Sequence, residues 1–451
     1  MVDPADDWAD RTADPAGGTA DRAGGTAAGA PPGPAVRGGA LRLPEFRALA
    51  VAGLLSATGD QLARVALSVL VYDRTSSALL TALTYALTFL PAVVGGPLLA
   101  GLADRRPRRR LMVGANLVQA LAMAGMAVPR LPLGALLGLL VVVNVLAAPF
   151  NAARAALMPD VTRDRYVSAL VVDRTLQQTA QVLGFVGTGL LLLVLSPSTA
   201  LIGDAASFLA SAVLLRGWVL ERAPATAVAS AGGAAGAAGV DGVVDGAAGA
   251  AGRRSRVGGA LHDASLGTST IWRDPRVRQA VLVTWVVSAF AIVPEALAAP
   301  YARTLTGGPL LVALLMAANP VGNVVSGLWA RRWSSRADRA LGPLAQLAVL
   351  PLAFCLFRPP APVVLGLVGL SGVGMTVSLV ARTVFVANIP TRVRGRAFGV
   401  AAAGITVSQG VAVAIAGAAA SPLAPSTVIG AAGLVGSVAA VVLTTATRVR
   451  G

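Results

Sequence analysis

A short, strongly basic segment between two long apolar runs constrains this chain most. Residues 100–110 have the sequence Ala-Gly-Leu-Ala-Asp-Arg-Arg-Pro-Arg-Arg-Arg, whereas residues 78–99 and 111–128 are almost wholly apolar. Each run is long enough to cross the hydrocarbon core of a bilayer as a helix. The connecting turn cannot lie in hydrocarbon, and short loops rich in arginine stay on the cytoplasmic side. We therefore expect a tight helical hairpin whose turn faces the cytoplasm.

Similar apolar runs recur along the whole chain. Hydrophobic residues make up 55% of the sequence and charged residues 13%, with a mean hydropathy of +0.72. Soluble domains contain about a quarter charged residues, so this composition is typical of an integral membrane protein. The runs predict an all-α polytopic membrane protein with twelve transmembrane helices. Their approximate ranges are 47–72, 78–103, 110–128, 131–153, 166–194, 198–219, 277–302, 307–331, 341–357, 361–386, 396–420 and 424–446.

Arginines alternate between dense and sparse loops, and this alternation predicts the orientation. Because arginine is retained in short cytoplasmic loops, we expect a multi-pass protein of the inner (plasma) membrane with both termini in the cytoplasm. The net charge of +16 then reflects anchoring at the lipid bilayer, and no nucleic-acid partner is expected. The arginines assigned to the cytoplasm are those at 105–110, 154, 163, 165, 331, 332, 336, 339, 392, 394, 396, 448 and 450, and those assigned to the opposite side are at 74, 130, 303 and 358.

Two sequence correspondences at nearly the same offset indicate duplicated halves. The segment that begins at Gly101 matches the one at Gly327, and Arg154 with its following basic residues matches Arg382 with its own. Duplicated halves predict two pseudo-symmetric six-helix bundles with a binding site near the bilayer midplane. The expected parts are a disordered cytoplasmic tail (1–43), a first bundle (44–220), an Ala/Gly-rich cytoplasmic linker (221–270) and a second bundle (271–447).

The segment 100–110 resembles the signature of the major facilitator superfamily, usually written G-x-L-A-D-R-x-G-R-R. Ala100 stands where the first glycine is usual, and Pro107 replaces the second. Proline keeps a turn but restricts its geometry. The positions that agree with the signature are Leu102, Ala103, Asp104, Arg105, Arg108 and Arg109.

Further stretches resemble one branch of that superfamily, the bacterial exporters related to enterobactin and macrolide efflux proteins. This branch resemblance implies export of a drug, an antibiotic or a siderophore. It does not identify the substrate. The stretches are Gly59-Asp60 with Arg64, Leu157 to Asp160, Asp204 to Phe208, and Pro390 with Arg394 to Arg396.

Two acidic positions inside predicted spans are candidates for proton coupling. Asp60 and Arg64 are four residues apart in the first span and so share a helical face. Asp60 either takes and releases a proton, with Arg64 tuning it or attracting an anionic substrate group, or the two form a structural ion pair. Glu295 follows Pro294 in the seventh span, where a broken helix could line a cavity. The alternative is that the span ends earlier and Glu295 lies at the outer surface.

Other polar residues in the predicted spans are interpreted by position. Asp204, near the start of the sixth span, is expected to cap the helix or pair with its dipole. Arg174, Gln177, Gln178 and Gln181 form one stripe that faces the substrate path or emerges into the cytoplasm. Asn319 and Asn323 bridge helices or bind a polar substrate. Arg382 either extends its head group to the cytoplasmic interface or pairs with a carboxylate.

The basic turn itself is expected to gate the cytoplasmic side. In proteins with this signature, the acid matching Asp104 contacts the amino end of the eleventh helix, here near 395–398. The loop arginines Arg105, Arg108 and Arg109 include one expected to pair with Asp160, after the fourth helix. We expect these contacts to join the two halves when the cytoplasmic side is closed, and their rupture to open it.

Together these features predict a monomeric secondary transporter that moves a small, partly apolar organic molecule by alternating access, driven by protons. No phosphate-binding G-x-x-x-x-G-K-[ST] segment occurs, so ATP hydrolysis by this chain is not expected. The single histidine excludes a histidine-based metal site or triad, and neither cofactor, metal nor enzymatic activity is expected. The alternatives left open are an importer or uniporter of a nutrient and a non-transporting sensor or scaffold. The aromatic candidates for lining the cavity are Tyr85, Phe89, Phe150, Phe185, Trp285 and Phe290.

Overall fold

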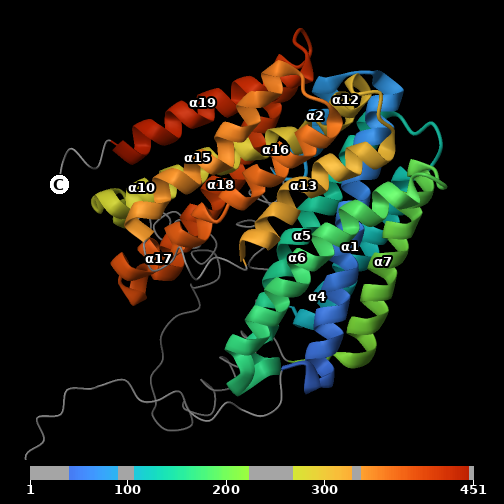
Figure 1. The fold of residues 1–451 in the computed structure, drawn as a ribbon. Helices are drawn as coiled ribbons and strands as arrows, with labels where there is room; N and C mark the ends of the chain where they lie inside the picture. Colours follow the sequence, from blue (N-terminus) through green and yellow to red (C-terminus); the bar gives the residue numbers. More distant parts are fainter. Residues whose placement is uncertain (1–39, 90–105, 223–267, 328–336, 446–451) are drawn as a thin grey trace, which may run out of the picture. The chain divides into compact units, whose positions relative to one another are not determined.

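The structure, a computed structural model, describes residues 40–89, 106–222, 268–327 and 337–445. All of them belong to one compact unit, Gly39–Gly451, and their regular secondary structure is entirely helical. Nine of the described helices are long and apolar enough to cross a membrane. Figure 1 shows the arrangement of the helices.

In the first predicted bundle the structure describes five long helices and one shorter helix, α2, which together we call the N-terminal half. The described part begins with a short 3₁₀ helix, Ala40–Arg42, whose Ala40 is buried, so these three residues of the predicted tail belong to the fold. The segment predicted at 78–103 is described only at its beginning. The helices are α1 (Pro44–Thr75), α2 (Ala78–Ala86), α4 (Arg108–Met126), α5 (Leu133–Thr162), α6 (Tyr166–Leu191) and α7 (Pro197–Trp218).

The remaining helices, which we call the C-terminal half, are more often interrupted. The seventh predicted span is broken at Ile292 and Leu297, and Pro294 and Pro300 lie in the first turn after each break. Proline is tolerated there, whereas inside a continuous helix it lacks the backbone N–H that the helix needs. The tenth predicted span is likewise divided, at 375–376. The helices are α10 (Pro275–Ala291), α11 (Val293–Ala296), α12 (Ala298–Thr304), α13 (Pro309–Gly327), α15 (Ala337–Ala353), α16 (Ala361–Gly374), α17 (Val377–Asn388), α18 (Thr391–Ala419) and α19 (Pro425–Thr445).

The end of the fourth predicted span differs from the structure, and the difference changes where Arg154 lies. The fourth span was expected to end at 153, but α5 continues to Thr162. Arg154 therefore lies inside a helix and is 7% exposed, so its assignment to a cytoplasmic loop is wrong. Its charge is paired inside the protein, and composition alone could not reveal that partner.

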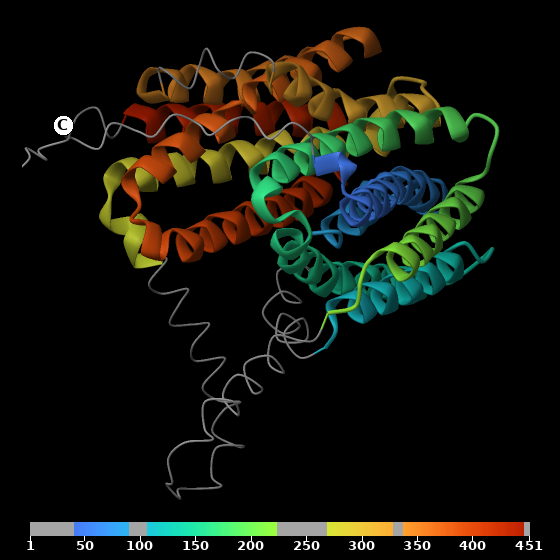
Figure 2. The ribbon, with the colours of Figure 1, turned by 90° about the horizontal axis from the view of Figure 1, so that it is seen from below.

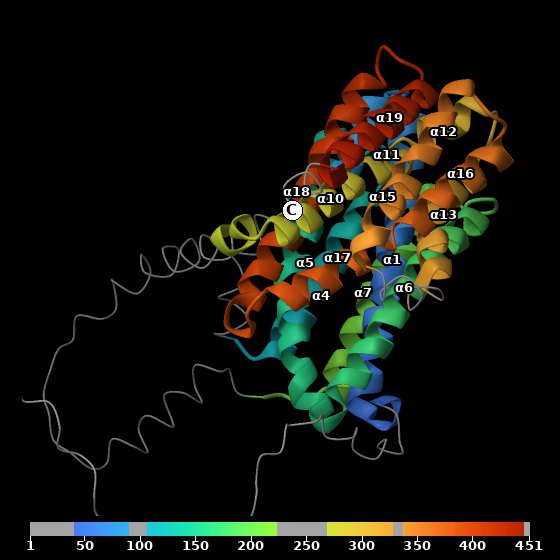
Figure 3. The same cartoon turned by 60° about the vertical axis from the view of Figure 1, so that its left-hand side comes forward.

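Contacts between the two halves gather near one end of the helices. We call this the arginine-poor end; it carries the connections at 76–77, 192–196, 305–308 and 420–424. In Figures 1 and 3, α6 runs beside α13. Gly189 of α6 lies against Leu310 and Ala313, and Gly417 of α18 lies against Leu79 and Ala82 of α2. The missing side chains allow these helices to approach closely.

The opposite end, which we call the arginine-rich end, carries residues 106–110, 163–165 and 389–394. Every ion pair at this end among the described residues joins parts of the N-terminal half. Figure 2 shows the helices of the two halves as two groups. Two arginines from different halves, Arg174 of α6 and Arg382 of α17, lie close enough to repel each other. Like charges oppose closure at this end in the conformation seen here.

The crossing of α13 and α16 gives a first prediction. A side chain at Gly322 would overlap the backbone carbonyl of Gly369, so Gly322→Ala should destabilise the protein by about 1–3 kcal/mol. A thermal melt of the purified protein measures the loss. Gly366→Ala on α16 is the matched control, because nothing lies within 4 Å of the added methyl group. Equal melting temperatures for the two variants would contradict this packing.

Candidate functional site

A buried hydrogen bond joins the two halves. The Tyr85 hydroxyl of α2 donates to Oε2 of Glu295 in α11 at 2.6 Å, and the residues are 2% and 4% exposed. Glu295 lies here because α10 ends at Ala291 and a one-turn helix, α11, follows with Pro294 in its first turn. Glu295 therefore does not lie at the outer surface, which was one of the two sequence interpretations. Its only described hydrogen-bond donor comes from the other half of the protein.

The Asp60/Arg64 face of α1 lies beside this bond. Both residues are half-buried, and they form no ion pair among the described residues. Arg64 instead donates from Nη1 to Oε1 of Gln61 at 3.3 Å. Its guanidinium lies 5.7 Å from the centre of the Phe89 ring, which packs edge-on against Tyr85. Arg64 also interacts electrostatically with Glu295 and Asp60, so one cation serves both carboxyl groups.

Asp204 is not a helix cap, and that expectation is wrong. Helix α7 starts at Pro197, and the side chain of Ser196 caps it by accepting from the backbone N–H of Thr199. Asp204 lies two turns further along, 1% exposed, and faces Gly59 of α1. Its carboxyl group contacts the Ser207 hydroxyl at 3.0 Å. The sequence alone could not show which face of α7 meets α1.

The polar segment of α6 divides into two parts. Asp173 forms an ion pair with Arg154 of α5, whose guanidinium packs against Gly53 of α1. This pair fixes α6 to the rest of the N-terminal half. Gln177 and Gln181 are half-buried, and no hydrogen bond of their side chains occurs within the described residues. They remain free to meet a ligand. Arg382 of α17 is exposed and pairs with no carboxylate among the described residues.

The two asparagines of α13 differ in environment. Asn319 is 8% exposed, and its Nδ2 lies 3.5 Å from Oγ of Ser371 in α16. Gly372 lies against the backbone of Asn319 at the same crossing. This placement agrees with the helix-bridging interpretation. Asn323, one turn along, is half-buried, and its backbone carbonyl accepts from Ser326 at 2.7 Å.

The basic turn is described in part. Asp104 and Arg105 lie outside the described residues, as do the corresponding positions 328–332. Arg108 donates from Nη1 to Oδ2 of Asp160 at 2.7 Å and to the Ala156 carbonyl at 3.0 Å. Both partners belong to the N-terminal half, so the expectation that this pair joins the two halves is wrong. The pair links α4 to the end of α5.

Arg109 has a different partner from Arg108. It donates to the Val219 carbonyl at 3.2 Å and to Oε2 of Glu221 at 2.8 Å, just beyond the end of α7. Cations near a helix C-terminus interact favourably with its dipole. Arg109 therefore anchors α4 to α7, again within the N-terminal half.

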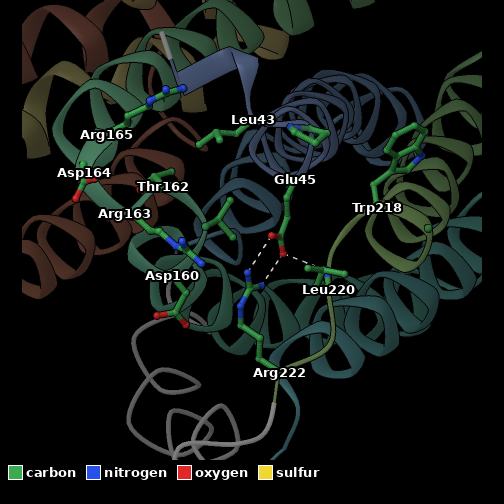
Figure 4. A pocket seen from close by; sticks show the side chains of 13 residues that line it. Leu43, Glu45, Asp160, Thr162, Arg163, Asp164, Arg165, Trp218, Leu220 and Arg222 are labelled. Atoms are coloured by element: carbon green, nitrogen blue, oxygen red, sulfur yellow. Dashed lines mark hydrogen bonds and ion pairs between the residues drawn. The ribbon is translucent and has the colours of Figure 1, made fainter. Parts of the chain in front are cut away.

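A hollow of about 600 Å³ opens at the arginine-rich end, among residues of the N-terminal half (Figure 4). Glu45 lies in it, accepting from the Leu220 backbone and from Arg222 at 2.9 Å. This hydrogen bond raises the pKa of the Arg222 guanidinium. The hollow is lined by residues of the 3₁₀ helix η2 (Arg163–Arg165) and of the ends of α1, α5 and α7, so it is separate from the Tyr85–Glu295 bond.

The aromatic residues predicted to line the cavity are buried or half-buried. Phe150 and Phe185 are 7% and 0% exposed and belong to hydrophobic cores. Trp285 packs against Gly404 and donates to the Ala401 carbonyl at 2.9 Å. Phe89 is half-buried beside Arg64. The sequence selected Tyr85 only as an aromatic surface, and its role as the partner of Glu295 was missed because 210 residues separate them.

Comparison of the sequence with known protein families identifies the family of this chain. The sequence profile described as Major Facilitator Superfamily matches residues 49–342. The chain belongs to the Major Facilitator Superfamily. A search of curated proteins finds no match.

Solved structures of superfamily transporters share the fold. The nucleoside transporter NupG has a TM-score of 0.63 at 13% identity, over 89% of this chain and 97% of that one. The peptide transporter POT in complex with sulfate has a TM-score of 0.65 at 14% identity, over 90% and 94%. A bacterial homologue of the iron transporter ferroportin, in an inward-facing state, has a TM-score of 0.61 at 17% identity, over 90% and 99%. At such identities the likeness concerns the fold alone.

Proposed function

We propose that this superfamily member is a proton-coupled exporter of a small, partly apolar organic compound. The observation that carries the proposal is the buried Tyr85–Glu295 hydrogen bond between the two halves. A titratable group placed on the surface that must separate can couple proton binding to a conformational change. Export, and a drug, antibiotic or siderophore as cargo, follow from the branch resemblance.

Alternating access follows from the way the halves meet. Their close contacts gather at the arginine-poor end, through Gly189, Gly417 and the exposed Arg303–Asp73 ion pair. If arginine-rich loops face the cytoplasm, the conformation seen here is closed to the outside. Transport then requires these contacts to open and the arginine-rich end to close. Asp104 and Arg105 are proposed to take part in that closure.

The proposed coupling step moves a proton onto or off Glu295. When Glu295 is ionised, the Tyr85 hydroxyl makes a charge-assisted hydrogen bond that holds α2 against α11. When Glu295 takes up a proton, the bond loses its charge and weakens. Separation of the halves at this end then becomes easier. Asp60, on the neighbouring face of α1, is the proposed second proton carrier.

The substrate is proposed to contact groups that the structure leaves partly accessible. Phe89 offers an aromatic surface, and Arg64 beside it offers a positive charge for an anionic group. Gln177, Gln181 and Asn323 offer amides that can hydrogen-bond a polar group. A mixed apolar and polar compound fits this set better than an ion or a sugar does.

Transport measurements test the proposal. A host that lacks its own exporters, expressing this protein, is challenged with a panel of antibiotics and siderophores. We expect lower accumulation of at least one compound, and loss of that effect when an uncoupler collapses the proton gradient. Asp60→Asn should raise accumulation of that compound back towards the level of cells without the protein. Increased accumulation would indicate an importer, and no effect on any compound would contradict drug or siderophore export.

A further inference from the structure

The carboxyl group of Asp204 occupies a sealed position between α7 and α1, which lie side by side in Figure 1. Gly59 of α1 makes this position possible, because a side chain there would overlap Asp204 Oδ1 and Ser207 Oγ. Asp204 is 1% exposed. An acidic side chain so deeply buried inside a membrane helix requires a compensating partner.

The hydrogen bonds around Asp204 indicate which form of the carboxyl group is present. The Ser207 Oγ lies 2.8 Å from the Asp204 backbone carbonyl and 3.0 Å from Asp204 Oδ1. A hydroxyl has one hydrogen to donate and can also accept. If Asp204 is ionised, this hydrogen must be divided between two acceptors, and Oδ2 has no donor among the residues that the structure describes. If Asp204 carries a proton on Oδ1, it donates to Ser207, and Ser207 donates to the backbone carbonyl.

The surrounding charges favour the second arrangement. From α1, the ionisable group that acts on Asp204 is Asp60, whose negative charge would repel a second carboxylate. Arg64 is turned to Gln61 and Phe89 and makes no ion pair with Asp204. From α4, the polar groups in the membrane are amides with other partners: Asn116 donates to Ser211 and Gln119 to the Val143 carbonyl. The arginines of α4, Arg108 to Arg110, are in its first turn, and their described ion pairs are with Asp160 and Glu221.

We propose that Asp204 is a proton-binding residue, and that Asp60 and Asp204 together hold one proton in this conformation and release it during the transport cycle. The proton leaves Asp204 Oδ1 for Asp60 or for water, and no bond other than O–H is broken. The proposal rests on the proposed function, and it gives the N-terminal half a proton site separate from Glu295. Asp204 thereby becomes a third coupling residue, beside Glu295 and Asp60, rather than a structural one.

Infrared spectroscopy of the purified protein tests the proposal without a substrate. A protonated carboxyl group gives a C=O stretching band that an ionised one lacks. We expect this band at neutral pH in the wild type and a smaller band in Asp204→Asn. The amide replaces the proposed O–H donor with an N–H donor to Ser207, so the variant should fold. Asp164→Asn, at an exposed position, is the matched control and should leave the band unchanged.

A second variant decides the matter if Asp204→Asn does not fold. Ser207→Ala removes the acceptor of the proposed O–H bond, so the band should persist and move to higher wavenumber. An unchanged band in folded Asp204→Asn, or an unmoved band in Ser207→Ala, would overturn the proposal. If the bands behave as expected while Asp60→Asn leaves transport intact, the proton site stands and the proposed proton-coupled function falls.

Discussion

Glu295→Gln is expected to abolish proton-driven uphill transport while the protein still folds and reaches the membrane. Glutamine keeps the size of the side chain and can still accept from Tyr85, but it cannot bind or release a proton. A hydrogen bond to a charged group contributes about 1.5–3 kcal/mol and one between neutral groups about 0.5–1.5 kcal/mol, so about 1 kcal/mol is lost. Such a loss changes the balance between the two conformations about 5-fold. Proteoliposomes with an imposed pH gradient and a substrate found in the panel measure the effect.

Tyr85→Phe is the matched variant for the other partner of this bond. It keeps the ring that packs edge-on against Phe89 and removes only the hydroxyl. Glu295 can still titrate, so transport should be slower but should still respond to the pH gradient. Uphill accumulation by Glu295→Gln at the wild-type rate would show that coupling does not pass through this carboxyl group.

Asp173→Ala is expected to be the most destabilising single change on the described polar residues. It leaves Arg154, which is 7% exposed, as an unpaired charge against Gly53 and the core of the N-terminal half. Breaking a buried ion pair by removal of one partner costs about 3–5 kcal/mol. We expect a large drop in melting temperature in detergent and reduced expression. A fluorescence-monitored thermal melt of the purified variant provides the measurement.

Two controls test whether the loss of stability comes from leaving a buried charge unpaired rather than from breaking any ion pair. Arg154→Met with Asp173→Leu replaces both partners by apolar side chains and should recover much of the lost stability. Asp73→Ala breaks the exposed pair with Arg303 and should change stability by no more than about 1 kcal/mol. The account of the Arg154–Asp173 pair is wrong if Asp73→Ala and Asp173→Ala lower the melting temperature equally.

The helices could be predicted because hydrocarbon imposes a length and a composition on each span. Predicted ranges such as 198–219 and 424–446 lie within a few residues of α7 and α19. Exceptions arise where proline divides a span, as at Pro294, or where a charged residue is buried, as at Arg154. Arg154 was assigned to a loop because a charged residue lowers the local hydropathy. Its partner Asp173 lies in another helix, so the sequence does not show that the charge is paired inside the protein.

The candidate site was predictable only in its individual residues. Intramembrane charges such as Asp60 and Glu295 are visible in a sequence because they are rare in apolar runs. Their partners depend on which helix faces meet, and that is decided by packing at glycines such as Gly59 and Gly417. Tyr85 was therefore assigned only to the lining of the cavity, and Asp204 to the cap or dipole of its helix. Arg108 was paired with the correct residue, Asp160, but the pair does not join the two halves.

Distance measurements between spin labels test alternating access most directly. One labelled pair, Ser76→Cys with Thr306→Cys, lies on loops of opposite halves at the arginine-poor end, and a second pair, Asp164→Cys with Asn388→Cys, lies at the arginine-rich end. Cys355, which is buried, is replaced by alanine in both proteins. As the pH is lowered in lipid and Glu295 takes up a proton, the distance at the arginine-poor end should lengthen while the distance at the arginine-rich end shortens. Two distances that stay fixed at every pH, or that change in the same direction, would contradict alternating access.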